Sequence, residues 1–188
     1  MGNLRPILGG NALLDPLKIL NKAGIAEGQK VADLGCGTAG HFVIPAARMV
    51  GDKGHVYAVD ILKSALEGVK SRAKLEGITN LDTIWSDLEV YNATKIDTNS
   101  LDVALLINVL FQTKKHDEIL KETARMLKSG GTLLVVDWKM TDIPAFGPDS
   151  EMRIDPEKIK QTAQDLNLEL TKEFEAGKFH FALTFKKK

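Results

Sequence analysis

The sequence predicts an α/β fold, in which a Rossmann-like doubly wound parallel sheet ends in a β-hairpin. Short apolar runs alternate with longer amphipathic segments, a glycine-rich loop follows the first run, and the last two runs flank a turn. Near-continuous apolar strands separated by helices are typical of a parallel sheet that is covered on both faces. The two final runs are expected to add an antiparallel strand to that sheet.

The predicted helices share apolar residues at three- and four-residue spacing. The first is expected over residues 11–23, where Pro16 is tolerated in the first turn and places the start near Asp15. Ser129-Gly130-Gly131 is expected to close a later helix, because glycine is common where helices stop. The remaining helices are expected at 40–50, 62–76, 116–127 and 156–166.

The predicted strands are short apolar runs bounded by turn residues. A turn at Glu175-Ala176-Gly177 is expected to join the last two of them into a hairpin. In chain order, the strands are expected at 30–34, 55–60, 81–86, 101–107, 132–137, 168–173 and 178–185.

The length of 188 residues predicts one domain over 1–188, which can bury a sizeable core without disulfides. Within it we expect an N-terminal helical segment (1–24), a substrate-side loop (138–155) and the C-terminal hairpin (168–186). No apolar run approaches the roughly 20 residues needed to span a bilayer, and the first residues do not resemble a signal peptide. Cys36 is the single cysteine, so an intrachain disulfide is excluded, which fits a reducing cytoplasm.

The charge balance is neutral, with 25 Lys and Arg against 25 Asp and Glu. Proteins that bind nucleic acid by its phosphates usually carry a basic excess, so the balance argues against a large nucleic-acid footprint and leaves open only a local basic patch. The whole-chain pattern favours a small-molecule substrate, with protein and RNA as alternatives. Lys186-Lys187-Lys188 is predicted to be a solvated tail. The four histidines show no metal-ligand spacing, so no metal is predicted. The oligomeric state is not indicated.

The glycine-rich loop runs from Asp33 to Gly40, directly after the first strand. In doubly wound sheets, ligands bind at the carboxyl ends of the strands, and glycines let the backbone approach them closely. The spacing Gly35-x-Gly37-x-x-Gly40 matches the dinucleotide fingerprint, and Asp60, 20 residues later, suits ribose hydroxyls. The glycines alone therefore leave NAD and S-adenosylmethionine (SAM) open, and they could also serve only as a tight turn.

Two features favour SAM. A carboxylate at Asp33, before the first glycine, would repel a pyrophosphate but suits the ammonium group of a methionine moiety. The chain also ends in a hairpin where a complete dinucleotide domain needs another βαβαβ half. An NAD-dependent oxidoreductase and a non-catalytic SAM-binding protein stay as alternatives. Cys36 is interpreted as a small filler of the loop, because no catalytic base can be placed beside it.

From about Leu13 to Phe185, the chain resembles the class I SAM-dependent methyltransferases. Five segments carry the likeness: Val31–Gly40 for the first motif, Val56–Asp60 for the second, Ser86-Asp87-Leu88 for the third, Leu101–Gln112 for the fourth strand and its loop, and Leu127–Val136 for the post-motif. Within the class, the chain looks like small prokaryotic methyltransferases that are loosely related to the ubiquinone/menaquinone and arsenite methyltransferases. It lacks the paired cysteines that arsenite methylation would use. After the fourth strand, it also lacks the Asn-Pro-Pro-Tyr type motif that is typical of methyltransferases acting on nucleic-acid bases.

The resemblance implies SAM as cofactor, methyl transfer as activity, and a seven-stranded sheet of order 3-2-1-4-5-7-6 with strand 7 antiparallel. It also implies which residues bind SAM. Asp33, Gly35, Cys36 and Gly37 would form the loop at the methionine part, Asp60 would bind the ribose with Ile61 on the adenine, Asp87 and Leu88 would contact the adenine edge, and Asn108 would lie near the methionine part or the substrate.

Methyl transfer from a sulfonium is an in-line displacement, so alignment is the main task of the protein. No catalytic base can be assigned from the sequence. Three residues are substrate-side candidates, and each has a structural alternative. His41 could act in catalysis or be an exposed residue at a helix end, and Trp138 could form a wall of the substrate site or belong to the core. Arg153 could bind an anionic substrate or form an ion pair with Asp149 or Glu151. His180 is expected to be structural or exposed.

Overall fold

The computed structural model describes residues 13–140 and 147–188, and its elements follow the predicted alternation of strands and helices. None of the helices within these ranges is long and apolar enough to cross a membrane. In chain order the elements are α1 (Pro16–Ala23), β1 (Lys30–Leu34), α2 (Val43–Val50), β2 (His55–Asp60), α3 (Lys63–Leu75), β3 (Leu81–Trp85), β4 (Leu101–Ile107), η2 (Leu110–Gln112), α4 (His116–Met126), β5 (Leu127–Trp138), η3 (Ser150–Met152), α5 (Pro156–Asp165), β6 (Leu168–Gly177) and β7 (His180–Lys187).

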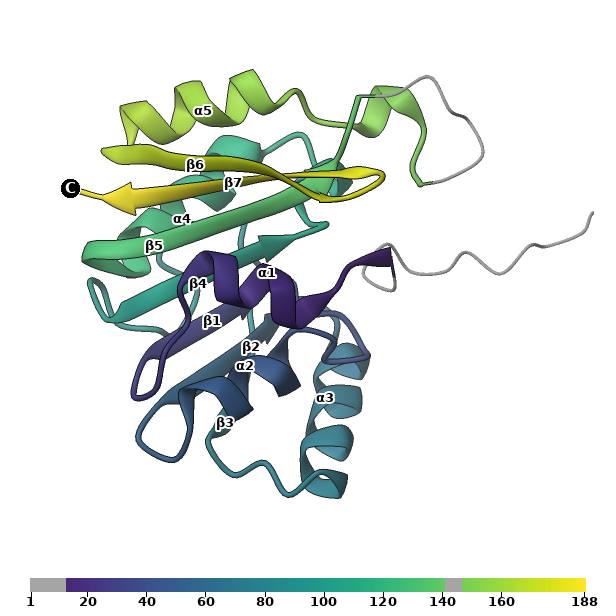
Figure 1. Cartoon of the computed structure of the whole chain (residues 1–188), viewed down its shortest axis with the longest axis vertical. Helices are drawn as coiled ribbons and strands as arrows, with labels where there is room; N and C mark the ends of the chain where they lie inside the picture. The colour runs from purple at the N-terminus through teal and green to yellow at the C-terminus, as the bar shows by residue number, and fades with distance from the viewer. Residues whose placement is uncertain (1–12, 141–146) are drawn as a thin grey trace, which may run out of the picture.

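The seven strands form one sheet of order β3-β2-β1-β4-β5-β7-β6, which confirms the predicted fold class (Figure 1). The first five strands in chain order pair in parallel, whereas β7 runs antiparallel to both β5 and β6. The strand order reverses at β1, which lies between β2 and β4. The glycine-rich loop therefore leaves the sheet where doubly wound proteins bind their ligands.

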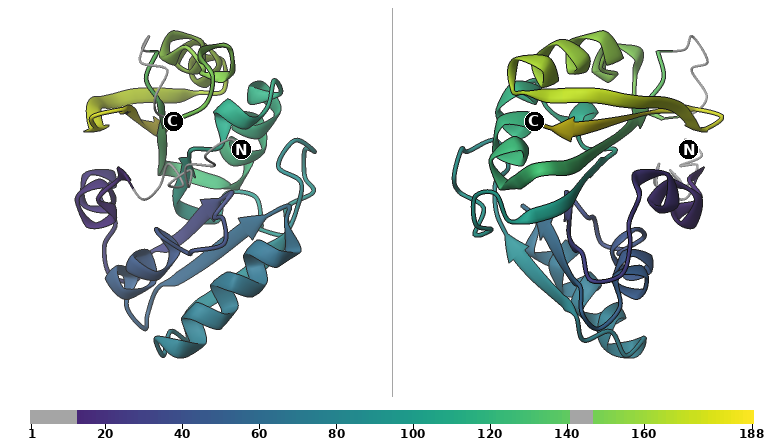
Figure 2. Two further views of the ribbon diagram at one scale, coloured as in Figure 1. Left: turned by 90° about the vertical axis from the view of Figure 1, so that its right-hand side faces the viewer. Right: turned by 60° about the vertical axis from the view of Figure 1, so that its left-hand side comes forward.

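Helices cover both faces of the sheet, and each face has its own apolar core. One core joins α1, α2 and α3 to residues such as Val31, Val103 and Leu134. The other joins α4 and α5 to residues such as Leu106 and Leu133, so neighbouring residues of one strand enter opposite cores. The left view of Figure 2 shows α1 and α4 on opposite sides of the sheet. Burial on both faces explains why the central strands are mostly apolar.

The start of α1 agrees with the prediction drawn from Pro16. Asp15 is the N-cap, and its side chain accepts a hydrogen bond from the backbone N–H of Lys18 at 3.2 Å. The helix ends at Gly24, whose φ of 78° is left-handed. Residues 11–12 of the predicted helix lie outside the described residues.

The prediction was wrong at the start of β5. The structure begins this strand at Leu127, directly after α4, because Leu127 pairs with Leu101 before a register shift at the glycines. Gly130, at φ 75°, lies within the irregular part of the strand and does not close the helix. The hairpin differs too, since β6 extends to Gly177 and the turn falls at residues 178–179.

Candidate active site

The glycine-rich loop folds back over the end of β2. Backbone N–H groups of Gly35 and Cys36 both donate to the carbonyl of Val59, at 2.8 and 3.0 Å. Gly35 has φ 82°, and a Cβ placed there would lie 2.6 Å from a methyl group of Val109. Gly37 is also left-handed, at φ 64°, with open space where a Cβ would stand. Position 35 therefore requires glycine on two independent counts.

Asp60 ends β2 and anchors this loop through both carboxylate oxygens. Oδ2 accepts from the backbone N–H of Gly37, and Oδ1 accepts from that of Leu62, both at 2.9 Å. The residue is 8% exposed, which leaves the carboxylate at the rim of the loop. A carboxylate oxygen has more than one lone pair, so Asp60 can hold the loop and still accept hydrogen bonds from a ligand.

Asp33 lies at the other side of the loop, within β1, and is only 3% exposed. Burial raises the pKa of its carboxyl to about 7, and the nearby charge of Asp60 adds to the rise. Among the residues that the structure describes, Asp33 takes part in no ion pair. A buried carboxyl without a cation beside it suits a ligand that brings a positive charge.

The loop after β3 carries Asp87 and Leu88, and Asp87 shapes it locally. The side chain of Asp87 accepts from the backbone N–H of Glu89 at 2.9 Å. Ser86, just before it, shares a 3.0 Å hydrogen bond with Thr94 further along the loop. No motif in the sequence predicts which residues hold the distant part of this loop.

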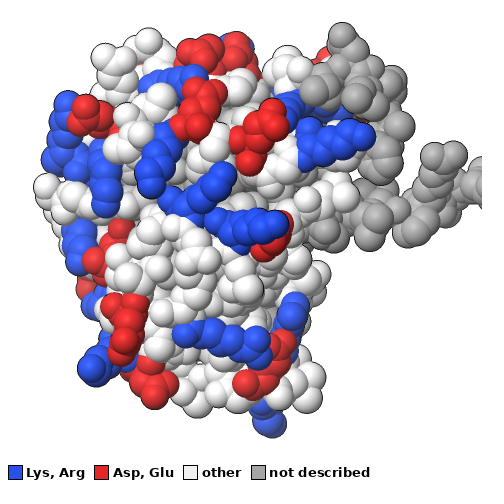
Figure 3. All heavy atoms as spheres, viewed as in Figure 1, with Lys and Arg blue, Asp and Glu red and all other residues white. Residues whose placement is uncertain are grey.

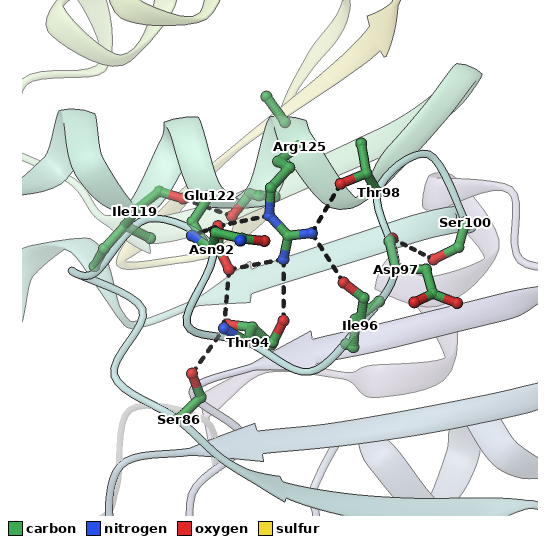
Figure 4. A network of polar contacts seen from close by, with 12 residues as sticks. Ser86, Asn92, Thr94, Ile96, Asp97, Thr98, Ser100, Ile119, Glu122 and Arg125 are labelled. Atoms are coloured by element: carbon green, nitrogen blue, oxygen red, sulfur yellow. Dashed lines mark hydrogen bonds and ion pairs between the residues drawn. The ribbon is translucent and has the colours of Figure 1, made fainter.

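A buried ion pair on α4 holds that distant part (Figure 4). Arg125 contacts Glu122 through two nitrogens, each at 2.8 Å, and Glu122 is fully buried. The free carboxylate positions accept from the N–H groups of Asn92 and Thr94, while the guanidinium donates to the carbonyls of Thr94 and Ile96. Every polar group of the pair is thus satisfied, which is the condition under which a buried ion pair is tolerated.

These elements enclose a cavity of about 390 Å³, hereafter the cofactor cavity. Its volume lies within the range of about 300–1,000 Å³ that is usual for small-molecule and cofactor sites. Six of the predicted residues line it: Gly35, Gly37, Asp60, Ile61, Asp87 and Leu88. Sequence reasoning missed another seven: Leu62, Ser86, Glu89, Val109, Gln112, Thr113 and Ile119.

Asn108 directly follows β4 and is not among the residues that line this cavity. Its φ of 56° is left-handed, which is uncommon for a residue other than glycine and is best tolerated by asparagine. Its N–H donates to the carbonyl of Val136, and its own carbonyl accepts from the side chain of Gln112, at 2.8 and 2.7 Å. Asn108 therefore fixes the start of the segment that places Val109 and Gln112 at the cofactor cavity.

Asp137 supports the same segment from β5 and is fully buried. Its carboxylate accepts from the N–H groups of Trp138 and Phe111, at 2.8 and 3.2 Å. Burial raises the pKa of Asp137 to about 6, and these backbone hydrogen bonds limit the rise. The side chain of Asp137 faces backbone donors, so its role is to support the loop that follows β4.

Cys36 is buried behind the glycine-rich loop and does not line the cofactor cavity. Burial raises the pKa of its thiol, and the charge of Asp33 adds to this rise. Because the thiolate is the reactive form, we expect Cys36 to resist Ellman's reagent in the folded protein and to react at once in urea. Rapid labelling without urea would contradict this inert role, which agrees with the interpretation of Cys36 as a filler.

The three substrate-side candidates lie apart from the cofactor cavity. His41 is half-buried, with Nε2 3.2 Å from the carbonyl of Leu14. Arg153 donates to the carbonyls of Pro148 and Lys139, at 3.0 and 2.9 Å. Trp138 is 4% exposed and packs at the end of β5. Within residues 13–140 and 147–188, no cluster of histidine, cysteine and carboxylate side chains could hold a metal ion.

Comparison with known proteins gives consistent matches. A family model described as "Methyltransferase domain" matches residues 25–183. The ubiquinone/menaquinone biosynthesis C-methyltransferase UbiE of Haemophilus ducreyi is 32% identical over 131 residues, which cover 69% of this chain and 48% of that protein. The demethylmenaquinone methyltransferase of Lactococcus lactis is 27% identical over 69% of this chain and 50% of its own length.

A solved structure extends the match to nearly the whole fold. The SAM-dependent methyltransferase from Aquifex aeolicus superimposes with a TM-score of 0.83 at 25% identity, covering 92% of this chain and 89% of that one. By contrast, this chain spans about half the length of the curated relatives that it matches in sequence.

Proposed function

Because this chain belongs to the class I SAM-dependent methyltransferases, with SAM as its methyl donor, we propose that its acceptor is a small organic molecule. The observation that carries the proposal is the cofactor cavity, where the glycine-rich loop, Asp60 and Asp87 meet at the carboxyl edge of the sheet. The names of the relatives make a quinone-type ring the first acceptor to test. In the reaction, the sulfonium S–CH₃ bond breaks as the acceptor–CH₃ bond forms, S-adenosylhomocysteine (SAH) leaves, and the acceptor loses a proton.

The charge distribution supports a small acceptor over a nucleic acid. Figure 3 shows Lys and Arg interspersed with Asp and Glu on the face in view, with no large area of one sign. Across the chain the two kinds of charge are equal in number, at 25 each. A protein that neutralises many phosphates needs a local excess of cations. We place the enzyme in the bacterial cytoplasm, which is supported by its bacterial relatives and its single cysteine.

We assign the residues that line the cofactor cavity, and the residues beside it, as follows. The carboxylate of Asp60 binds the ribose hydroxyls, and the half-exposed Ile61 beside it covers the adenine. Asp87 accepts from the adenine amino group, with the backbone of Leu88 at the ring edge. The backbone at Gly35, Cys36 and Gly37, together with Asn108, surrounds the methionine part.

The ammonium group of the methionine part is assigned to Asp33. A buried carboxyl that lacks an ion-pair partner among the described residues is stabilised in its ionised form when a cation arrives. No side chain is assigned as catalytic base, because Asp137 is bonded to backbone N–H groups. His41, Trp138 and Arg153 remain proposed substrate-side residues.

Cofactor affinity is expected to rise with pH in a way that depends on Asp33. Its pKa of about 7 in the folded protein lies above the usual 3.8, so below pH 7 the carboxyl is mostly protonated and binding a cation must release that proton. The logarithm of the Kd for SAH should therefore fall by about one per pH unit below pH 7 and level off above it. Titration calorimetry between pH 5.5 and 8.5 measures this dependence.

The variant Asp33→Asn is the matched control for that titration. It should bind SAH more weakly and show no pH dependence in this range. By the same linkage, the protein without ligand should lose more stability in the wild type than in the variant as pH rises from about 4 to 7, because Asp137, whose pKa is also raised by burial, contributes equally to both. An equal pH dependence in both proteins would contradict the assignment of Asp33.

The proposed function is tested by ligand stabilisation and by methyl transfer. SAM or SAH should raise the Tm, whereas NADH should leave it unchanged. Transfer of a labelled methyl group from SAM to a panel of hydroxylated aromatic rings, peptides and RNA then identifies the acceptor class. Transfer to RNA or to peptides, and to no small molecule, would overturn the proposed acceptor.

A further inference from the structure

Another cavity, of about 270 Å³, lies between the end of α1 and the sheet and is hereafter called the lysine cavity. It is lined by residues at the end of α1, near the start of β4, in the first half of β5, in β6 and near the end of β7. Figure 1 shows the end of β7 beside the start of β5, at the edge of the sheet away from the glycine-rich loop. The cofactor cavity shares no lining residue with the lysine cavity, so the two are separate sites.

The register of the hairpin brings two lysines and a threonine together on one face of the sheet. Thr184 of β7 lies opposite Lys172 of β6, and Lys186 follows Thr184 by two residues. Because side chains alternate along a strand, these three share a face with Ala182, which belongs to the core on the α1 side. Lys22, near the end of α1, reaches the same cavity from above this face.

The charges of the lysine cavity are not balanced by its own residues. Within the part of the chain that the structure describes, none of Lys22, Lys172 and Lys186 takes part in an ion pair. The lining contains one carboxylate, Asp102, which is already paired with Lys128 and accepts from a backbone N–H. Three positive charges less one negative charge leave the described lining with a net charge of +2.

The lysine side chains keep hydrogen-bond donors that a ligand can use. Lys186 donates to the carbonyl of Gly130 at 2.8 Å, and Nζ of Lys22 lies 4.2 Å from the centre of the Phe174 ring. Since an ammonium group has three donors, Lys186 keeps two of them after this contact. The expectation of a solvated tail was wrong for Lys186, which lies within β7. The lysine cavity thus combines positive charge with free N–H donors, which favours an anionic ligand.

Thr184 brings a buried hydroxyl to the lysine cavity. The residue is 4% exposed, and its Oγ1 is buried and makes no hydrogen bond to any residue that the structure describes. A buried hydroxyl normally has a partner, because otherwise it loses its hydrogen bonds to water and gains none in return. Its neighbours Lys172 and Lys186 are exposed and have flexible stems, which can move to admit a ligand atom. The hydroxyl of Thr184 therefore indicates a bound group that accepts its hydrogen bond.

We propose that the lysine cavity binds a phosphate group, either as the free ion or on a small molecule. A phosphate monoester carries about −1.5 to −2 charges at pH 7, which matches the lining, whereas a carboxylate supplies only one. Its oxygens accept from the hydroxyl of Thr184 and from the ammonium groups of Lys172 and Lys186.

The size of the lysine cavity agrees with this ligand. Its volume of about 270 Å³ lies just below the range of about 300–1,000 Å³ that is usual for cofactor sites. A cavity of this size suits one phosphate group, unlike the row of phosphates that a nucleic acid presents. The site is remote from the cofactor cavity, so the inference does not depend on the proposed function.

The test is titration calorimetry on the full chain near pH 7, with and without saturating SAH. Inorganic phosphate and glycerol 3-phosphate are the probes, acetate is the control with a single charge, and chloride keeps the ionic strength constant because salt screens charges. Both phosphates should bind with a Kd in the millimolar range or below, equally well with and without SAH. Acetate should bind about tenfold more weakly or worse. Tighter binding of the ester would assign the site to an organic phosphate, and equal or tighter binding of inorganic phosphate would assign it to the free ion.

Variants locate the binding. Thr184→Val keeps the shape of the side chain and removes the hydroxyl, so it should lose about tenfold or more of the phosphate affinity. Its Tm without phosphate should be unchanged or higher, because an unpartnered polar atom is gone. Lys172→Gln removes one charge and should lose about as much affinity, which keeps the test valid if Thr184→Val does not fold. Lys178→Gln, in the turn of the same hairpin and outside the cavity lining, should leave the affinity unchanged.

Three results would overturn the proposal. The first is that the wild-type protein binds neither phosphate, and the second is that acetate binds as tightly as the phosphates do. The third is phosphate binding that Thr184→Val and Lys172→Gln leave unchanged, which would show attraction to the surface charge as a whole. If Thr184→Val has a lower Tm with unaltered phosphate affinity, the role of Thr184 is packing and the proposal is wrong.

Discussion

Asp60→Ala is expected to weaken SAH binding by about 100-fold or more. The variant removes the proposed acceptor for two ribose hydroxyls, and hydrogen bonds to a charged group contribute about 1.5–3 kcal/mol each. It also releases the N–H groups of Gly37 and Leu62, so the glycine-rich loop loses its anchor. Titration calorimetry and the Tm shift on adding SAH measure the loss.

Two variants separate these contributions. Asp60→Asn keeps one oxygen that can accept from the loop, so it should bind SAH better than Asp60→Ala. Asp82→Ala, on the exposed side chain of β3, removes a carboxylate from the neighbouring strand and should leave the affinity unchanged. If Asp60→Ala binds SAH as tightly as the wild type, the assignment of Asp60 to the cofactor site is wrong.

Arg125→Met is expected to lower the free energy of unfolding by about 3–5 kcal/mol, because it leaves the fully buried carboxylate of Glu122 without its cation. That carboxylate would keep only the N–H groups of Asn92 and Thr94. The loop that carries Asp87 loses three hydrogen bonds from the guanidinium, so SAH affinity should fall as well. Urea unfolding at pH 7 measures the stability.

The pH dependence of the free energy of unfolding tests the role of the Glu122–Arg125 pair. Burial alone would raise the pKa of Glu122, but the hydrogen bonds from Arg125 and the two backbone N–H groups lower it overall. A carboxylate whose pKa is depressed by folding stabilises the protein above its unfolded pKa, and this contribution is lost as the pH falls through the folded value. Arg125→Met should therefore lose less stability than the wild type on acidification.

The double variant Glu122→Leu/Arg125→Met, which leaves no buried charge, should recover part of the stability that Arg125→Met loses.

The sequence predicted the central strands almost to the residue, because the physics that defines them is local. Strands such as β1 and β4 are mostly apolar runs that end at a turn residue. The start of β5 was missed, because Gly130-Gly131 is typical of a helix end and only the pairing of Leu127 with Leu101 shows that a strand has begun. The cores on both faces follow from the strand pattern once the layers are known.

The site was predictable only as far as its motifs extend. The glycine-rich loop and the acidic residues Asp60 and Asp87 could be placed, because strand ends in a parallel sheet meet at one edge. Thr113, in the cavity lining, carries no such signal. Glu122 and Arg125 lie three residues apart on α4, but their role depends on hydrogen bonds to the distant loop at Asn92 and Thr94. The sequence did not decide whether His180 is structural or exposed, because its burial depends on how the hairpin packs against Trp138.

One of the two edge strands of the sheet, β6, bears on how copies of this protein behave at high concentration. An unpaired strand edge can recruit the edge of another molecule and start aggregation. Charged side chains stand along this strand and are exposed: Glu169, Lys172, Glu173 and Glu175. A second copy that tried to continue the sheet here would have to strip water from these charges, so β6 protects the protein against aggregation through this edge.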